Sequence, residues 1–345
     1  MNKSKLQIKL AFITGLREIV LNEISQSANL RVIKEEGDYI YLDFMQDLTV
    51  IKRLRSVSRA YIVVQNSKYN PRYISNHKSI LGNLIEIAIS GNKDKFKTFK
   101  IICAGSDSPR VRSIAEYIQK AYRLTEKEES DMKIHIIKLD EIWEIGVQIT
   151  SRPLSFRDYK IKNMSGAMDP TIAYAVNSLC ELESANSYLN IFSGSATLLI
   201  EAGQCYPNLK QLIGFDNNKK SISLAIQNIK KAGLIKKIQL KEKDIFDKPD
   251  LGKFDVITSD LPFGMSISKN EDLENLYRCF VEYCQETLNH GGKLAVYTSK
   301  HEILKQIILE SRLKIIKTLE LKFITSVNAY LRPKIFVCRL KQSSV

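Results

Sequence analysis

The sequence predicts an α/β fold: an open, Rossmann-like sheet in the carboxyl-terminal half, preceded by a smaller α+β part. Between residues 187 and 264, four short apolar runs are each followed by a turn with a small or acidic residue. The helices expected between them repeat their apolar residues every three to four positions, as in alternating strands and helices. At 345 residues the chain exceeds one ordinary domain, so we expect two or three.

The first of these units is a strand over residues 187–191, a turn over 192–196 and a helix that begins at Thr197. The turn reads FSGSA, and its small side chains let the backbone approach a ligand closely. The free N–H groups at the start of the helix would face that ligand. The pattern is typical of a nucleotide-binding turn, and an ordinary strand-to-helix loop is the alternative.

Acidic residues follow the next three apolar runs. Asp216 ends the second strand, where a carboxylate can accept hydrogen bonds from both hydroxyls of a ribose. Asp244 follows a third strand over 238–240, and Asp260 follows a fourth over 254–259 and opens the sequence DLPFG, residues 260–264. Ligands of open α/β sheets bind at the carboxyl ends of the strands, so we expect these residues to line one edge.

Here the chain resembles a known family. NIFSGSATLLIEAG resembles the methionine-binding turn of Rossmann-type methyltransferases that use S-adenosyl-L-methionine, and DLPFG resembles their fourth motif. RDYKIKNMSGAMDPTIAYAV, residues 157–176, extends the match upstream, and the amino-terminal half resembles a THUMP module with its preceding ferredoxin-like segment. The whole arrangement is similar to the tRNA guanosine amino-methyltransferases of the Trm14/TrmN group.

The resemblance implies a cofactor, a reaction and a set of site residues. Asp260 and the carbonyl group of Leu261 would accept the two hydrogens of the guanine amine, with Pro262 shaping the turn and Phe263 stacking on the base. The substrate would be a guanosine of tRNA, at position six of the acceptor stem, and ribosomal RNA is the alternative. S-adenosyl-L-methionine would be held by Asn190, Phe192, Ser193, Gly194, Ser195, Ala196, Asp216, Asn217, Asp244, Ile245 and Asp260.

Three residues depart from the family pattern. Asn190 stands where aspartate is usual, Ser193 where cysteine is common, and Ala196 where glycine normally lies beside the methionine part of the cofactor. The methyl group of Ala196 could crowd the cofactor or require a φ below zero at that residue. Activity is favoured because Asp216, Asp244 and DLPFG remain together. The alternative is an RNA-binding protein whose methyltransferase domain has decayed.

The amino-terminal half concentrates positive charge. The chain carries a net charge of +14, with 28 Lys plus Arg against 19 Asp plus Glu in residues 1–162. This balance favours binding to a polyanion, although a solvated surface is the alternative for any single residue. We expect a ferredoxin-like segment over 1–55, a THUMP domain over 56–150, a linker over 151–164 and a methyltransferase domain over 165–345. The expected RNA-binding residues are Lys97, Lys100, Arg110, Arg112, Lys120 and Arg123.

Other classes of protein fit less well. GSATLL lacks the third glycine of the dinucleotide-binding pattern, which argues against a nicotinamide enzyme. The six cysteines form no pair or cluster with zinc spacing, so we expect no metal and a reducing, cytoplasmic location. No apolar run approaches the length that crosses a membrane. The oligomeric state is left open.

Overall fold

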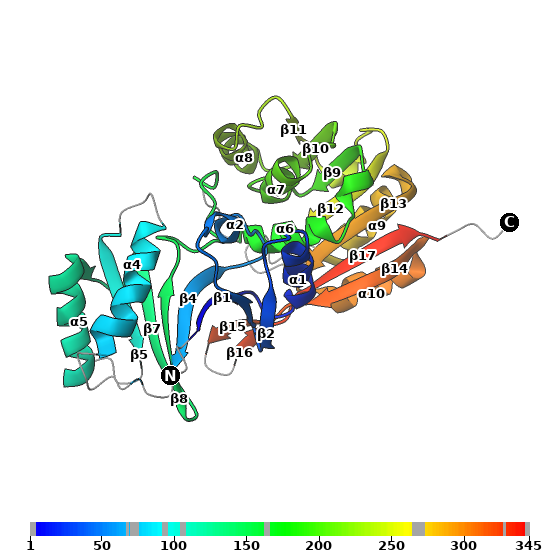
Figure 1. Cartoon of the computed structure of the whole chain (residues 1–345). Coiled ribbons are helices and arrows are strands. Elements are labelled where there is room, and N and C mark those ends of the chain that lie inside the picture. The colour runs from blue at the N-terminus through cyan, green and yellow to red at the C-terminus, as the bar shows by residue number, and fades with distance from the viewer. Residues whose placement is uncertain are drawn as a thin grey trace. The chain divides into compact units, whose positions relative to one another are not determined.

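The computed structural model describes residues 5–66, 69, 76–91, 96–103, 108–161, 166–263, 273–326 and 329–341. The chain forms two compact units (Figure 1). Unit 1 comprises Met1–Phe12 and Val20–Ser155, and unit 2 comprises Ile13–Ile19 and Phe156–Val345. The boundary after Ser155 falls inside the segment predicted as a linker.

Unit 1 is built on an eight-stranded sheet with the order β2-β3-β1-β4-β8-β7-β5-β6. Its strands are β1 (Leu6–Ala11), β2 (Val32–Glu36), β3 (Tyr39–Asp43), β4 (Arg59–Asn66), β5 (Thr98–Cys103), β6 (Thr125–Glu126), β7 (Met132–Leu139) and β8 (Ile142–Gln148). Its helical segments are most of α1 (Arg17–Ser25), α2 (Thr49–Lys52), the π-helical turn η1 (His77–Leu81), α4 (Gly82–Ser90) and α5 (Pro109–Tyr122).

Alternation along the strands of unit 1 separates an apolar face from a polar one. Ile8 and Leu10 are 0% exposed and lie on the face opposite to Lys9, as a period of two requires. The β2 to β3 hairpin turns at Gly37, whose φ of +56° suits a residue without a side chain. Strands from residues 1–55 and from residues 56–150 share this one sheet. The division between a ferredoxin-like and a THUMP part stays a prediction.

Unit 2 is built on a seven-stranded sheet with the order β11-β10-β9-β12-β13-β17-β14. Strands β9 to β13 are parallel, and β17 is antiparallel to both of its neighbours. The strands are β9 (Ser187–Ile191), β10 (Gln211–Asp216), β11 (Ile238–Glu242), β12 (Phe254–Asp260), β13 (Leu288–Thr298), β14 (Leu313–Glu320) and β17 (Lys334–Leu340). The predicted α/β sheet is confirmed.

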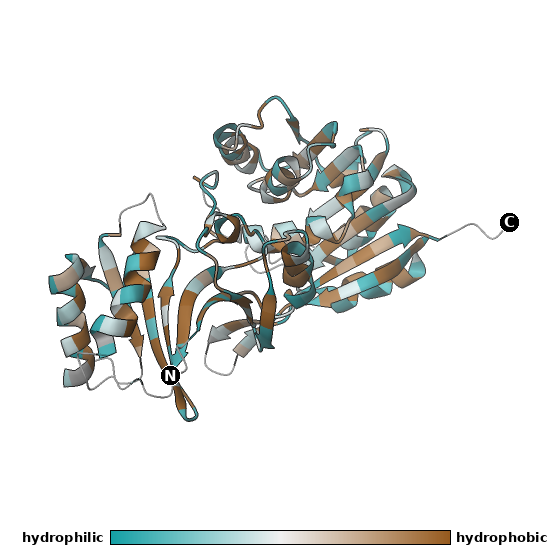
Figure 2. Ribbon diagram, in the orientation of Figure 1, coloured by the Kyte–Doolittle hydropathy of each residue, from teal (hydrophilic) through white to brown (hydrophobic). Residues whose placement is uncertain are grey.

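Helices join the strands of unit 2, and apolar residues fill the space between them. They are α6 (Pro170–Ser178), η2 (Leu182–Ser184), α7 (Thr197–Cys205), α8 (Lys219–Lys231), η3 (Ile245–Asp247), α9 (Leu273–Thr287) and α10 (His301–Glu310). The pair Asp169-Pro170 predicts the start of a helix, and Asp169 caps α6, accepting a hydrogen bond from the Thr171 N–H, with Pro170 as its first residue. Brown, apolar residues run along the strands in Figure 2. In the core of unit 2, Leu189, Ile257 and Phe280 are fully buried.

The local sequence predicts a strand that starts after Gly291-Gly292 and one long strand over 315–324, and the structure differs at both places. Strand β13 begins at Leu288 rather than after the glycine pair, because Gly291 adopts a φ of +78° and the strand continues through a register shift opposite β12. The long strand predicted over 315–324 ends at Glu320, and a small hairpin of β15 (Phe323–Ser326) and β16 (Ala329–Leu331) follows. Both differences occur where a bulge or turn interrupts a run of strand-forming residues.

Candidate active site

The predicted site residues lie at the carboxyl ends of neighbouring parallel strands. Asp216 ends β10, the turn over 192–196 follows β9, Asp260 ends β12, and Asp244 comes two residues after β11. The chain leaves β9 toward β10 and β11 on one side and then crosses to β12 on the other. The point between β9 and β12 is therefore the topological switch point, where open α/β sheets bind their ligands.

The turn after β9 has an unusual backbone. Phe192, Gly194 and Ala196 all have left-handed conformations, with φ of 56°, 51° and 63°. A negative φ at Ala196 was one of two expectations for this residue, and it is wrong. The Ala196 carbonyl accepts the first hydrogen bond of α7, from the Ile200 N–H at 2.9 Å, which fixes its conformation. A residue that carries a side chain costs about 1–2 kcal/mol when its backbone is left-handed. Such strain is common at functional sites.

Hydrogen bonds attach this turn to the end of β10. The Ser193 hydroxyl donates to the Phe215 carbonyl at 2.9 Å, and the Gly194 N–H donates to Asp216 Oδ2 at 2.9 Å. The Asn218 N–H donates to Asp216 Oδ1, also at 2.9 Å. Burial raises the pKa of Asp216, and these two backbone donors act in the opposite direction. The carboxylate is thus held in one orientation at the edge of the sheet.

Asp244 lies beside Asn217, the residue that follows Asp216. Asn217 Nδ2 donates to Asp244 Oδ2 at 2.9 Å, and the Phe246 N–H donates to Asp244 Oδ1 at 3.0 Å. Ile245, which follows Asp244, is 2% exposed and anchors the turn in the core. The structure therefore brings the predicted pairs Asp216 with Asn217 and Asp244 with Ile245 into one continuous edge.

Asn190 lies near the end of β9, and the two polar atoms of its side chain differ in their hydrogen bonding. It is 1% exposed, and its Nδ2 donates to the Thr258 carbonyl at 3.1 Å. Its Oδ1 is buried and, within the described ranges, has no hydrogen-bond partner. A buried acceptor without a donor is unfavourable, and an N–H group that reached this oxygen would remove that cost.

The sequence after β12 forms a turn braced by aromatic side chains. Asp260 pairs with Tyr297 across the strands, and the Leu261 N–H donates to the Tyr297 carbonyl at 3.0 Å. The Tyr277 hydroxyl donates to the Pro262 carbonyl at 2.9 Å. The rings of Phe263 and Tyr297 lie 5.6 Å apart between centroids, inclined by 54°. Gly264, the last residue of the predicted motif, lies outside the described residues.

The environment of Asp260 changes its acidity. Burial raises the pKa of Asp260 to about 7, and the positive charge of Lys160 acts in the opposite direction. A group with a pKa near neutrality can exchange a proton at physiological pH. Asp260 can therefore accept hydrogen bonds in its ionised form and can also take up a proton.

Sequence reasoning missed the contacts of the segment that precedes α6. Residues 156–161, within the predicted linker, belong to unit 2, where the Arg157 Nε and the Tyr159 hydroxyl both donate to Glu201 Oε1 at 3.0 and 2.8 Å. Glu201 is 0% exposed. A glutamate inside the apolar helix TLLIEAG was the available signal, because a buried carboxylate requires a partner. Residues 162–165 of the resembling segment lie outside the described residues.

The residues expected to bind RNA lie on β5, α5 and their flanks in unit 1. Lys97, Lys120 and Arg123 are exposed. Lys100 forms an ion pair with Glu128 at 2.6 Å, and Arg112 pairs with Glu126. Arg110 belongs to α5, and its side chain is outside the described part of the structure.

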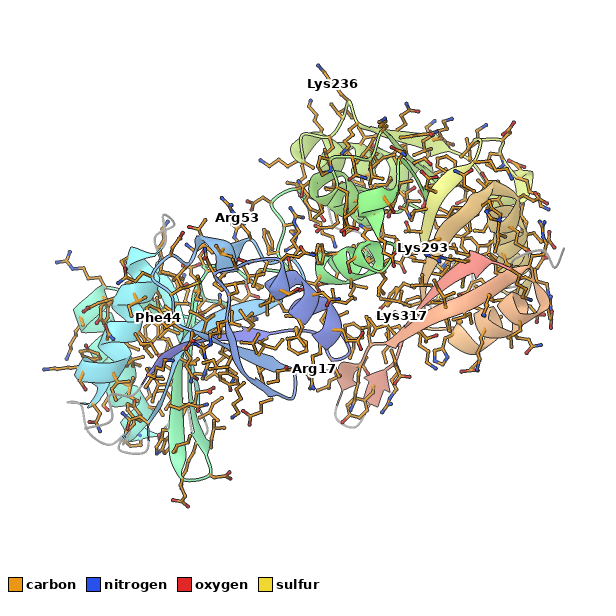
Figure 3. All side chains as sticks on the ribbon, turned by 45° about the vertical axis from the view of Figure 1, so that its right-hand side comes forward. Arg17, Phe44, Arg53, Lys236, Lys293 and Lys317 are labelled. Carbon is orange, nitrogen blue, oxygen red and sulfur yellow. The ribbon has the colours of Figure 1, made fainter. Side chains whose placement is uncertain are left out.

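Basic residues of unit 2 differ in their surroundings. Lys236 points outward from the loop between α8 and β11, whereas Lys293 on β13 is buried and pairs with Glu181 at 2.5 Å (Figure 3). Among the described residues, no group of three or more His, Cys, Asp or Glu side chains is arranged to hold a metal ion. None of the described helices combines the length and apolarity that a membrane span requires.

Together, the sheet order, the turn after β9 and the turn after β12 define a Rossmann-like methyltransferase fold. The chain superimposes on the crystal structure of TrmN from Thermus thermophilus with a TM-score of 0.73, at 19% sequence identity, over 97% of this chain and 99% of that one. This likeness establishes the fold of the whole chain.

The family of the carboxyl-terminal part follows from a protein-family model described as the RMKL-like methyltransferase domain, which matches residues 157–326. The carboxyl-terminal part of the chain is therefore a methyltransferase domain similar to this family. It is 24% identical to the U6 snRNA (guanine-N(2))-methyltransferase THUMPD2 of Mus musculus over 64% of this chain. It is 27% identical to a tRNA (guanine(6)-N2)-methyltransferase of Thermus thermophilus over 58% of this chain. The matches span 42% and 60% of the lengths of these relatives.

Proposed function

We propose that this protein transfers a methyl group from S-adenosyl-L-methionine to the exocyclic amine of a guanosine in tRNA. The observation that carries the proposal is the turn of Asp260, Leu261, Pro262 and Phe263, located across the switch point from the turn over 192–196. The two relatives named for guanine-N2 methylation support the guanine amine as the acceptor. The relative named for tRNA guanine(6) supports position six of the acceptor stem.

The residues present fit the cofactor. The Asp216 carboxylate can accept hydrogen bonds from ribose hydroxyls, since each of its oxygens accepts only one backbone N–H in the described structure and retains another lone pair. Asn190 Oδ1, which has no hydrogen-bond partner among the described residues, is an acceptor suited to an amino group. Asp244 and the adjacent Ile245 would border the adenine ring. When bound, S-adenosyl-L-methionine supplies an electrophilic methyl group on a positively charged sulfur.

The protein's own task is to orient a weak nucleophile. The lone pair of the guanine amine is delocalised into the ring, so the amine must be held in a geometry that directs this pair outward. The Asp260 carboxylate and the Leu261 carbonyl would accept the two amine hydrogens, and Phe263 would stack on the base. The base must first leave its own stack in the RNA. The Tyr277 hydroxyl, through the Pro262 carbonyl, keeps the turn rigid during this step.

Asp260 would also receive the proton that the amine loses on methylation. Its pKa of about 7 lets it hold a proton near neutral pH, so the same carboxyl group can orient the amine and then act as a base. The proton is finally released to water.

Unit 1 would supply most of the affinity for RNA. The exposed Lys97, Lys120 and Arg123 can contact phosphates, which strengthens binding without selecting a base sequence. We propose that unit 1 acts as the THUMP-type RNA-binding part and presents one guanosine to unit 2.

The direct test is to incubate the protein and labelled S-adenosyl-L-methionine with unmodified tRNA, ribosomal RNA and U6 snRNA transcripts in parallel. The RNA is then digested and the methylated nucleoside identified. We expect N2-methylguanosine in tRNA, at position six. Label confined to U6 snRNA or to ribosomal RNA would refute the tRNA assignment. Absence of both cofactor binding and methyl transfer would favour a decayed domain with an RNA-binding role.

A further inference from the structure

Helix α8 of unit 2 carries charge of one sign only. Its sequence, KKSISLAIQNIKK, contains four lysines and no acidic residue. The lysines are Lys219, Lys220, Lys230 and Lys231, and all four are exposed. Within the described residues none of them forms an ion pair, whereas Lys248, Arg278 and Lys317 of the same unit each pair with a glutamate. Helix α8 therefore presents concentrated, uncompensated positive charge to the solvent.

The period of the helix gathers this charge on one face. An α-helix turns once in about 3.6 residues, so positions 219, 220, 223, 227, 230 and 231 lie on the same side. The opposite side, with Ala225, Asn228 and Ile229, is buried. The exposed face contains lysines, Ser223 and Gln227, with Ile226, 42% exposed, at its margin. The two pairs of lysines are about 16 Å apart along the helix axis.

The first turn of α8 is unfavourable without an anion. The amino-terminal end of a helix carries a partial positive charge, which favours acidic side chains, yet Lys219 and Lys220 occupy this position. The Asn218 side chain already accepts hydrogen bonds from the Lys220 and Ser221 N–H groups, at 2.9 and 3.1 Å. The attraction for an anion therefore comes from the lysine side chains, and a bound anion would offset their repulsion by the helix end.

Helix α8 is attached to the candidate active site. Its buried Asn228 donates from Nδ2 to the Ser195 carbonyl at 3.3 Å, within the turn over 192–196. The helix begins directly after the two residues that follow Asp216. On the next strand, the Lys243 N–H donates to the Asp216 carbonyl at 3.1 Å, and Lys243 is exposed. The basic face therefore belongs to an element that borders the proposed cofactor site.

We propose that the exposed face of α8 is a second RNA-binding surface, located on the methyltransferase unit itself, which contacts phosphates of the substrate RNA. The choice of RNA as the polyanion rests on the proposed function. Lysines separated by neutral polar side chains can bind several phosphates without reading the base sequence. A membrane surface fits less well, because a membrane-binding helix inserts its apolar face, and in α8 Ala225 and Ile229 on that face are buried in unit 2.

The first experiment measures RNA affinity of the full chain against salt concentration. The four lysines of α8 are replaced together by Gln, and binding to a tRNA transcript is followed by filter binding. We expect the affinity to fall at least about tenfold and the slope of log K against log salt concentration to fall by about one for each lost contact.

A control variant with the same change in net charge separates local contacts from the overall charge. It replaces four exposed lysines elsewhere in unit 2 by Gln, namely Lys210, Lys253, Lys305 and Lys314. Lys210 and Lys253 precede β10 and β12, so they lie at the edge of the sheet opposite to the site. We expect the control to lose much less affinity than the α8 variant. Equal losses in the two variants, or no loss in the α8 variant, would overturn the proposal.

A variant with opposite expected effects on stability and binding guards against loss of folding. Lys219→Glu combined with Lys220→Glu places acidic side chains in the first turn, where the helix dipole favours them. Its Tm should equal or exceed that of the parent, while its RNA affinity should fall. Unchanged RNA affinity in this folded variant would overturn the proposal. So would loss of binding to phosphatidylserine vesicles with RNA binding unchanged, since the surface would then bind a membrane.

Kinetics separate this inference from the proposed function. In the variant with four Gln residues on α8, KM for the RNA should rise while kcat stays nearly unchanged, because the surface binds RNA away from the reacting atoms. If the parent methylates none of the RNAs, the proposed function fails, yet the salt-dependent binding still decides whether α8 contacts RNA. If the parent methylates RNA and the α8 variant keeps the same KM, the proposal is overturned.

Discussion

The charge state of Asp260 has a consequence for stability. The carboxyl group has a pKa near 3.9 in an unfolded chain and about 7 in the folded one, so the folded state binds its proton more tightly. Its contribution to stability is present at low pH and is lost as pH rises through the folded pKa. Asp260→Asn should therefore become more stable relative to the parent by about 2–3 kcal/mol between pH 5 and pH 8. Denaturant unfolding at both pH values measures this change.

Asp255, on the same strand, is the matched control. It accepts hydrogen bonds from the Asn186 and Ser187 N–H groups and from the Asn289 side chain, and its pKa is lowered. Both its folded and unfolded pKa values lie below about 5, so the effect of Asp255→Asn should be the same at pH 5 and pH 8. A pH-independent effect of Asp260→Asn as well would show that Asp260 has an ordinary acidity.

Asp216 provides the second prediction at the scale of single residues. Asp216→Ala removes the carboxylate proposed to hold the ribose hydroxyls and should weaken S-adenosyl-L-methionine binding by on the order of 2–4 kcal/mol. Isothermal calorimetry on the folded variant measures the loss. Asp247→Ala, which removes a nearby exposed carboxylate, is the control and should bind as tightly as the parent. Equal affinity for Asp216→Ala and the parent would exclude the proposed ribose contact.

At the scale of single residues, the sequence predicted where the acidic residues lie, but it did not predict the groups around them. Asp216, Asp244 and Asp260 follow recognisable apolar runs, and their positions after parallel strands bring them to one edge. The left-handed φ of Ala196 was not predictable, since it depends on where α7 is anchored rather than on the residue itself. The surroundings of Lys160 were missed because Glu201 and Asp260 are distant from it in sequence and approach it only in the fold.

At the scale of elements, strand β10 leaves room for the turn after β9 because Gly214 has no side chain. A Cβ atom at Gly214 would lie 2.4 Å from Leu199 Cδ1 and 2.6 Å from Ser193 Oγ, both closer than atoms can pack. Gly214→Ala should therefore displace the turn, destabilise the protein by about 1–3 kcal/mol and weaken cofactor binding. Thermal unfolding and calorimetry measure the two effects.

Gly203 on α7 is the matched control for this substitution. Its added methyl group would meet Leu234 Cδ1 at 3.0 Å, the end of a flexible side chain, and alanine is the better helix former. Gly203→Ala should change stability by less than about 1 kcal/mol and leave cofactor binding intact. Similar losses in both variants would mean that the region tolerates no added methyl group, and that Gly214 has no special relation to the turn.

The elements themselves were largely predictable because their hydrophobic periods are clear. Strand β9 and helix α6 begin where predicted, the latter because Asp169 and Pro170 form a strong helix start. The errors at β13 and β14 have a different origin. A glycine pair within a strand and a turn within an apolar run are decided by pairing with β12 and β17, which the local sequence does not encode.

At the scale of the whole molecule, the sequence predicted an α+β part followed by an α/β part. It did not predict which strands pair in the same sheet. Residues 6–148 contribute to one eight-stranded sheet, although their first 55 residues and the remainder read as separate patterns. Sheet neighbours such as β1 and β4 are far apart in sequence, and pairing between distant strands leaves no local signature.

The charge of unit 1 gives the last prediction. If Lys97, Lys120 and Arg123 contact phosphates, replacing all three by Gln should lower RNA affinity to a similar degree for every RNA tested. The slope of log K against log salt concentration should fall by about one for each lost contact, because fewer counterions are released. Filter binding over a range of salt concentrations measures both quantities. Lys236→Gln, which removes an exposed charge on unit 2, should reduce the RNA affinity and the salt slope less than the triple variant does. Binding of S-adenosyl-L-methionine should be unchanged in both variants. An unaltered salt slope in the triple variant would locate the phosphate contacts elsewhere on the protein.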